Sequence, residues 1–152
     1  MKRTTPSILL LALGLALAPT AASFAGENPP SDAQPLSEVL TAFEARGLGT
    51  IVEAEFDDGR WEIKTCVHRG DCLKHEVSTI GELLRSRETD FDDPLPPENG
   101  LLASQIAQRA EAREQAVINE LEFDDGRWEV ELRGNGRRVK LELDPVSGEP
   151  RR

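Results

Sequence analysis

The chain has 152 residues, with 28 acidic against 18 basic side chains and a formal net charge of -10. An acidic excess of this size repels nucleic-acid phosphates and anionic lipid headgroups, which argues against both as ligands. The length suits one ordinary domain or two small ones.

The first 25 residues are predicted to be a cleavable secretory signal. A basic start precedes an apolar run at 8–18, and small side chains at Ser23 and Ala25 predict cleavage after Ala25, with cleavage after Ala22 as the alternative. The run is shorter than the roughly 20 residues that span a bilayer, and no later segment is apolar enough, so we expect no membrane span in the mature form. A periplasmic or secreted protein is the expectation. Without the signal, the net charge becomes about -12.

An internal repeat organises the rest of the chain. The sequence EFDDGRWE at 55–62 recurs unchanged at 122–129, an offset of 67 residues that also aligns Ser37 with Ser104. Past the second strand the offset falls to 66, because the first copy has one extra loop residue. The repeat predicts two small modules that pack together, since a module of about 50 residues buries only a marginal core alone.

The predicted domain boundaries are set by this repeat. The first module is placed at 36–88 and the second at 101–152. Between them, 89–100 is rich in acidic residues and proline and is predicted to be a linker. The polar, proline-rich leader at 26–35 is expected to be disordered.

In the first copy the pattern changes from helical to alternating. A single apolar helix stripe is formed by Leu36, Val39, Leu40 and Phe43, with Ser37 as the expected N-cap and Gly47 as the stop. An alternating strand comes next, a tight turn is predicted at Asp58-Gly59, and two more strands come after it. The side chains expected to point inward from these strands are Val52, Ala54, Phe56, Trp61, Ile63, Thr65, Leu73, His75 and Val77.

The second copy repeats the pattern with smaller residues on its helix. The expected inward set is Ala103, Ile106, Ala107, Ala110, Leu121, Phe123, Trp128, Val130, Leu132, Val139, Leu141 and Leu143. Each module is therefore predicted to be one helix on a three-stranded antiparallel meander, an α+β fold. Trp61 and Trp128 are interpreted as core anchors rather than recognition residues, because both are inward and identically placed.

This order of elements resembles the PepSY domain family. The second copy is similar to it from about Leu101 to Arg151 and includes the closing turn DPVSGE at 144–149. The first copy is similar from Leu36 to Val77 and then diverges, because Ser78–Glu82 lacks the Asp and Pro. The resemblance implies a non-catalytic module outside the cytoplasmic membrane, associated with peptidase propeptides and with control of peptidase activity. It implies no catalytic residues and no cofactor.

Cys66, His68, Cys72 and His75 lie within ten residues, in superficial likeness to a metal-ligand cluster. Strand parity places both sulfurs on the outward face across a hairpin and His75 inward, so we expect a disulfide between Cys66 and Cys72 and no metal site. A reactive redox pair or a metal-handling accessory stays as an alternative function. A hydrolase of unknown type is a weaker alternative, since no Ser or Cys has a His and a carboxylate arranged for nucleophilic catalysis.

The leading hypothesis is a non-enzymatic binding or regulatory protein that contacts another protein. A periplasmic peptidase, which the protein would inhibit or chaperone, is the first candidate partner. The other possible role is sensing in the envelope. The contact would use the outward sheet face. Its charged residues are Glu53, Glu55, Glu62, Lys64, Lys74 and Glu76 in the first copy and Glu120, Glu122, Glu129, Glu131, Lys140 and Glu142 in the second.

Overall fold

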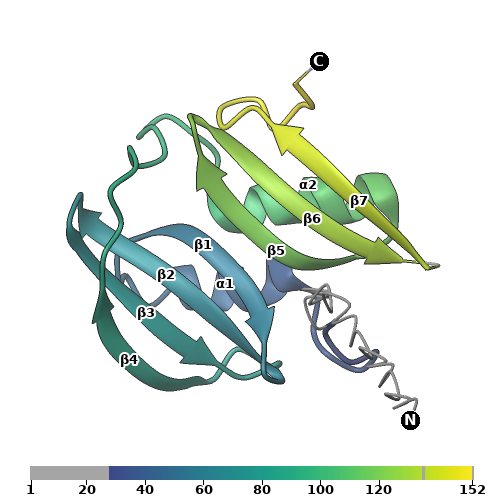
Figure 1. Ribbon diagram of the computed structural model, residues 1–152, viewed down its shortest axis with the longest axis horizontal. Coiled ribbons are helices and arrows are strands. Elements are labelled where there is room, and N and C mark those ends of the chain that lie inside the picture. Colours follow the sequence, from purple (N-terminus) through teal and green to yellow (C-terminus); the bar gives the residue numbers. More distant parts are fainter. Residues whose placement is uncertain (1–27, 135, 152) are drawn as a thin grey trace, which may run out of the picture.

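The protein has an α+β fold in which two helices cover one face of a single seven-stranded antiparallel sheet (Figure 1). A computed structural model describes residues 28–134 and 136–151. The expected signal peptide at 1–25 and its cleavage sites lie outside the described residues. Within the described part of the chain, no helix is long and apolar enough to cross a membrane.

The two tandem modules lie side by side in this sheet. The first comprises α1 (Leu36–Glu44), β1 (Thr50–Asp57), β2 (Arg60–His68), β3 (Asp71–Val77) and β4 (Leu83–Thr89). The second comprises α2 (Ala103–Glu114), β5 (Val117–Asp124), β6 (Arg127–Gly134) and β7 (Arg137–Leu143). The strand order is β4-β3-β2-β1-β5-β6-β7, so the modules meet at β1 and β5.

Strand β4 corrects the prediction of a three-stranded meander in the first module. It pairs with β3, and all of its residues but the last are exposed. An edge strand of this kind has no buried face, so LLRSRET carries no hydrophobic alternation that would have marked it as a strand. The strand also extends to Thr89, the first residue of the predicted linker.

The core lies between the helices and the sheet. Trp61 and Trp128 are each 1% exposed and each packs edge-on against a phenylalanine, Phe56 or Phe123, with ring centroids 5.2 and 5.3 Å apart. These T-shaped pairs fix both indoles under the helices. The predicted tight turn at Asp58-Gly59 is confirmed, with φ of 48° and 77° at its two central residues.

The modules are related by a pseudo-two-fold arrangement centred on the β1–β5 pairing. Ala54 lies opposite Leu121, its own equivalent at the offset of 67. On the helix side, Ser37 N–H and Oγ donate to Glu111 of the other module at 3.2 and 2.5 Å, and Ser104 makes the equivalent bonds to Glu44 at 3.0 and 2.6 Å. The modules thus hold each other reciprocally.

These contacts correct the expected role of Ser37. The N-cap of α1 is Pro35, and Ser37 lies inside the first turn. A carboxylate from the neighbouring helix accepts the hydrogen bond from the Ser37 backbone N–H. A negative charge is the charge that a helix N-terminus favours.

A bulge near the start of β1 corrects the expected direction of Val52. The register shifts between Ile51 and Glu53, so Val52 is an extra residue and packs in a cluster separate from the main core. The equivalent shift in β5 places Asn119 beside Glu131. Each bulge turns one residue out of the core, which simple alternation does not predict.

The leader and the linker are equivalent parts of the two modules. Pro29-Pro30 and Pro96-Pro97 are separated by the repeat offset of 67. Ala33 N–H donates to the Pro30 carbonyl at 3.0 Å, and Gly100 N–H donates to the Pro97 carbonyl at 2.8 Å. Pro29 is buried and Ala33 is half-buried, while the other described leader residues are exposed; residues 26 and 27 lie outside the described residues.

Candidate protein-binding face

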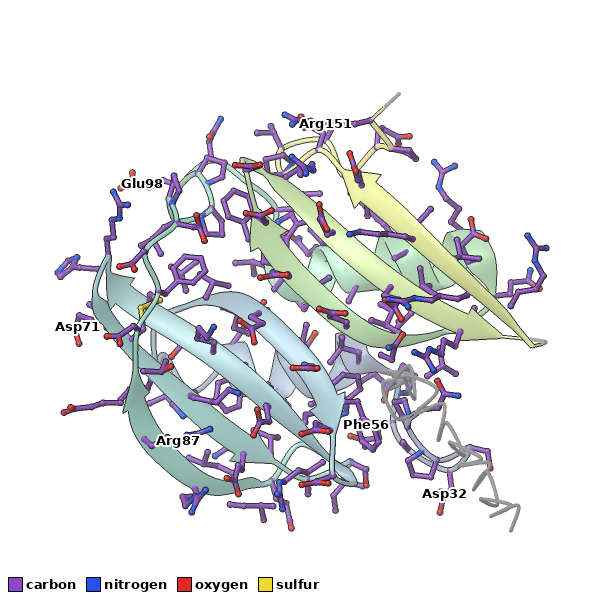
Figure 2. The ribbon with its side chains drawn as sticks, in the orientation of Figure 1. Asp32, Phe56, Asp71, Arg87, Glu98 and Arg151 are labelled. Atoms are coloured by element: carbon purple, nitrogen blue, oxygen red, sulfur yellow. A yellow bond between two sulfur atoms is a disulfide. The ribbon has the colours of Figure 1, made fainter. Side chains whose placement is uncertain are left out.

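The face of the sheet opposite the helices carries two rows of charged side chains. Figure 2 shows many carboxylate oxygens on the side of the sheet turned toward the viewer, while the helices lie behind it. Antiparallel register aligns these residues across the strands. This outward face holds the residues predicted for partner contact, namely Glu53, Glu55, Glu62, Lys64, Lys74, Glu76, Glu120, Glu122, Glu129, Glu131, Lys140 and Glu142.

Several of these charges neutralise one another across neighbouring strands. Lys64 pairs with Glu53, and Lys74 pairs with Glu62. In the second module Lys140 pairs with Glu129. The hydrogen bond from the Lys140 ammonium lowers the pKa of Glu129 below its ordinary value, and burial, which acts in the opposite direction, is the smaller effect. The flanks of the outward face are therefore internally compensated.

The centre of the outward face is not compensated. Glu55, Glu120 and Glu122 have no ion pair within the described residues, although their strands place acids directly opposite one another, with Glu53 against Glu122 and Glu55 against Glu120. Burial first, and then repulsion from neighbouring carboxylates, raises the pKa of each of the three, and the weaker attraction of nearby lysine and arginine side chains does not cancel this rise. Like charges directly opposite are destabilising, so the centre holds carboxylates that a cationic group would stabilise.

Glu131 is part of the outward face but is largely covered. It is 6% exposed and accepts hydrogen bonds from Arg138, from Asn119 at 3.2 Å and from Arg133 at 3.3 Å. Burial alone would raise the pKa of Glu131, but these bonds outweigh it and the pKa lies below its ordinary value. A hollow of about 230 Å³ lies beside it, lined by Glu120, Glu122, Glu129, Glu131, Arg138 and Lys140.

The linker covers one end of the outward face. Phe91 is 6% exposed and packs with Val52, Leu95 and the two cysteines. The Lys64 ammonium lies 5.6 Å from the centroid of the Phe91 ring, a cation–π distance. The linker therefore covers the end of the face next to the disulfide.

Cys66 and Cys72 lie opposite each other in β2 and β3 and form a disulfide, with Cα atoms 4.1 Å apart. Their residues are 0% and 4% exposed beneath the linker, so the sulfurs are not at an accessible hairpin tip. No group of His, Cys, Asp and Glu within the described residues has a metal-binding arrangement. The burial of both sulfurs favours a structural disulfide over a reactive redox pair.

His75 lies on the helix side of the sheet, away from the cysteines, as parity predicted. It is 1% exposed and packs against Phe43 in a tilted arrangement, with ring centroids 5.0 Å apart. Thr65 Oγ1 donates to the Leu48 carbonyl at 2.9 Å, so it must accept from His75 Nε2–H, leaving Nδ1 to accept from the Ser86 hydroxyl at 2.8 Å. Burial lowers the pKa of His75, so the ring is a neutral part of the core.

Sequence reasoning missed two features of this region. The Ser–Glu contacts between the helices are made by residues that share the repeat offset, Ser37 with Ser104 and Glu44 with Glu111. The repeat marks both pairs, but it does not show that they meet across the modules. The cover provided by Phe91 was also missed, although an isolated aromatic in an acidic linker is a signal for packing.

Comparison with known proteins agrees with this architecture. The sequence model of the PepSY family described as "peptidase propeptide and YPEB domain" matches residues 8–80 and 92–152. The two matched segments correspond to the two modules and cover most of the chain. The protein belongs to this family.

Other comparisons add little about the molecule. No curated protein matches the sequence. A solved structure from Clostridium difficile 630, described as a candidate lipoprotein, is similar with a TM-score of 0.46 and 13% sequence identity, over 78% of this chain and 90% of that chain.

Proposed function

We propose that this protein is a non-catalytic binding module that acts outside the cytoplasm and regulates a peptidase, or another envelope protein, by direct contact. The contact surface is the outward face. The observation that carries the proposal is the excess of acids at the centre of this face, where Glu55, Glu120 and Glu122 lie on the two middle strands and make no ion pair within the described residues.

This charge defines the chemistry of the partner. A lysine or arginine presented by the partner would pair with the central carboxylates and relieve repulsion that is already present in the free protein. The family description, a peptidase propeptide, supports a peptidase as the first partner to test.

The compartment is supported by the disulfide. Disulfides persist in oxidising environments such as the periplasm and are rare in the cytosol. Cys66–Cys72 is enclosed by Phe91, which is the arrangement of a structural rather than a catalytic bond. This agrees with the exported state expected from the sequence.

The test is affinity capture from an envelope extract with two charge-matched variants. One carries Glu55→Gln, Glu120→Gln and Glu122→Gln, which neutralise the centre of the outward face. The control carries Asp32→Asn, Glu38→Gln and Glu98→Gln, three acids outside this face. Figure 2 labels Asp32 and Glu98 at opposite ends of the molecule.

We expect the wild type and the control to retain one stoichiometric partner that the first variant loses, and binding to weaken as salt is raised. If the partner is a peptidase, its turnover should change on addition of the wild type and not of the first variant. Equal capture by all three proteins, or no stoichiometric partner, would contradict the proposal.

A further inference from the structure

Each module ends in a turn closed by a backbone hydrogen bond, but the two modules differ in the strand pairing beyond this turn. In the first module Ser78 N–H donates to the Glu82 carbonyl at 2.8 Å, and β4 then runs along β3. In the second module Asp144 N–H donates to the Glu149 carbonyl at 2.9 Å and closes a turn that is one residue longer. The second module therefore starts the same return toward its last strand.

That return covers only the end of β7. Pro150 forms an isolated bridge with Leu143, and Arg151 N–H donates to the Glu142 carbonyl at 2.8 Å. No described residue pairs with the outer edge of β7 from Arg137 to Leu141, which we term the edge segment. On the first module, β4 occupies the equivalent place.

The inward side of the edge segment shows the effect of this difference. Leu141 contacts the core but is only partly buried. Its equivalent in the first module is His75, which is 1% exposed and bonded to Ser86 of β4. A strand laid on β7 in the manner of β4 would bury Val139 and Leu141 further.

The outward side of the edge segment is basic in an otherwise acidic protein. Arg138 and Lys140 form ion pairs with acids of the neighbouring strand β6, and their side chains are still 61% and 58% exposed. The other edge of the sheet is also basic, because Arg85 and Arg87 on β4 are 64% and 55% exposed. Pairing of any two of these edges between copies of the chain would bring like charges together, which disfavours self-association.

We propose that the edge segment binds an extended segment of another protein, antiparallel to β7, in the place that β4 has on β3. Its side chains alternate between acidic and apolar. The acids face Arg138 and Lys140, and the apolar residues cover Val139 and Leu141. Backbone ladder bonds supply affinity and the alternating side chains supply selectivity. This surface adjoins the outward face, with which it shares Lys140, but it rests on the unpaired backbone edge of β7 and does not depend on the function proposed for that face.

The test uses the full protein and a fluorescein-labelled peptide of alternating Glu and Val flanked by Ser, with binding measured by anisotropy at low salt. A second peptide replaces each Glu with Lys. Two further peptides are N-methylated at every second backbone amide, one at the odd and the other at the even positions. Because alternate N–H groups of an extended peptide point to opposite edges, each of these peptides can form ladder hydrogen bonds along only one of its edges. We expect the acidic peptide to bind, the basic peptide to bind at least tenfold more weakly, and one methylated peptide to lose binding.

Protein variants place the site. Arg138→Gln with Lys140→Gln should weaken peptide binding roughly 2- to 30-fold, as expected for two cross-strand charge pairs. Arg85→Gln with Arg87→Gln on the opposite edge is the charge-matched control and should have no effect, as should Glu55→Gln on the outward face. Amide hydrogen exchange should slow at 137–141 when the peptide is bound.

Several results would overturn the proposal. These are no binding of the acidic peptide, equal binding of both methylated peptides, or exchange protection on β4 instead of β7. Growth of oligomers without peptide, measured by light scattering, would show that a second copy of the chain occupies the edge and would also overturn it. None of these results bears on capture through the outward face.

Discussion

The reciprocal Ser–Glu contacts between α1 and α2 predict a defined loss of stability. Ser104→Ala removes the 2.6 Å hydroxyl bond to Glu44 and keeps the backbone N–H bond. A hydrogen bond to a charged group contributes about 1.5–3 kcal/mol, and this one is only part-buried, so we expect a loss of about 1–2 kcal/mol. At roughly 4 °C for each kcal/mol, the Tm should fall by about 4–8 °C.

The loss should be shared with the partner carboxylate. Glu44→Gln weakens the same contact, so a double-mutant cycle of Ser104→Ala and Glu44→Gln should give a coupling energy of about 1 kcal/mol. Ser37→Ala should behave as Ser104→Ala does, because its bonds to Glu111 are equivalent. Thr41→Ala removes an exposed hydroxyl bond from the same helix and is the control, with an expected change of at most about 0.5 kcal/mol.

Urea denaturation monitored by tryptophan fluorescence measures this loss. Trp61 and Trp128 lie one in each module, so variants with a single tryptophan report on each module separately. We expect coincident transitions, since the modules share one sheet and hold each other through the helices. Separate transitions, or Ser variants that differ from wild type by no more than the Thr41 control, would refute the reasoning.

The sheet and its buried side chains lead to three further predictions. Glu120→Gln should stabilise the protein by about 0.2–1 kcal/mol at neutral pH. Because the folded-state pKa of Glu120 is raised, this gain should shrink as the pH falls through that pKa and Glu120 of the wild type becomes protonated. Urea titrations at several pH values measure the change. Reduction of Cys66–Cys72 should cost roughly 2 kcal/mol of unfolding free energy for a loop of this size, and thiol titration of the native protein should find no free cysteine. Because the pKa of His75 is lowered in the folded state, its contribution to stability is complete above the unfolded-state pKa of about 6.5 and is lost as the pH falls below that value. His75→Leu should therefore reduce the loss of stability between about pH 7 and 5. An unchanged pH profile of stability would contradict the neutral, buried state of His75.

The repeat and the alternation made most of the module predictable. The unchanged EFDDGRWE segment located both hairpins, and inward parity placed Trp61 and Trp128 in the core. These features are local, because strand alternation and turn residues occupy adjacent positions in the chain. One signal of the same kind was present and unused, the Pro-Pro pair at the repeat offset.

The pairing of β1 with β5 was not predictable from the sequence. It joins residues that are far apart in the chain, and nothing local favours strands that place Glu53 opposite Glu122. The bulge at Val52 is likewise set by the ladder as a whole. The residues of the outward face could be predicted from parity, whereas the lack of cationic partners at its centre could not, because it depends on how the modules meet.

The most direct test of the central claim is zero-length carbodiimide cross-linking of the protein with the partner captured from the envelope, with the products identified by mass spectrometry. This reagent joins a carboxylate to an amine in contact with it. We predict cross-links from Glu55, Glu120 or Glu122 to lysines of the partner. Cross-links confined to acids outside the outward face, such as Glu38 or Glu98, would contradict the claim that this face is the binding surface.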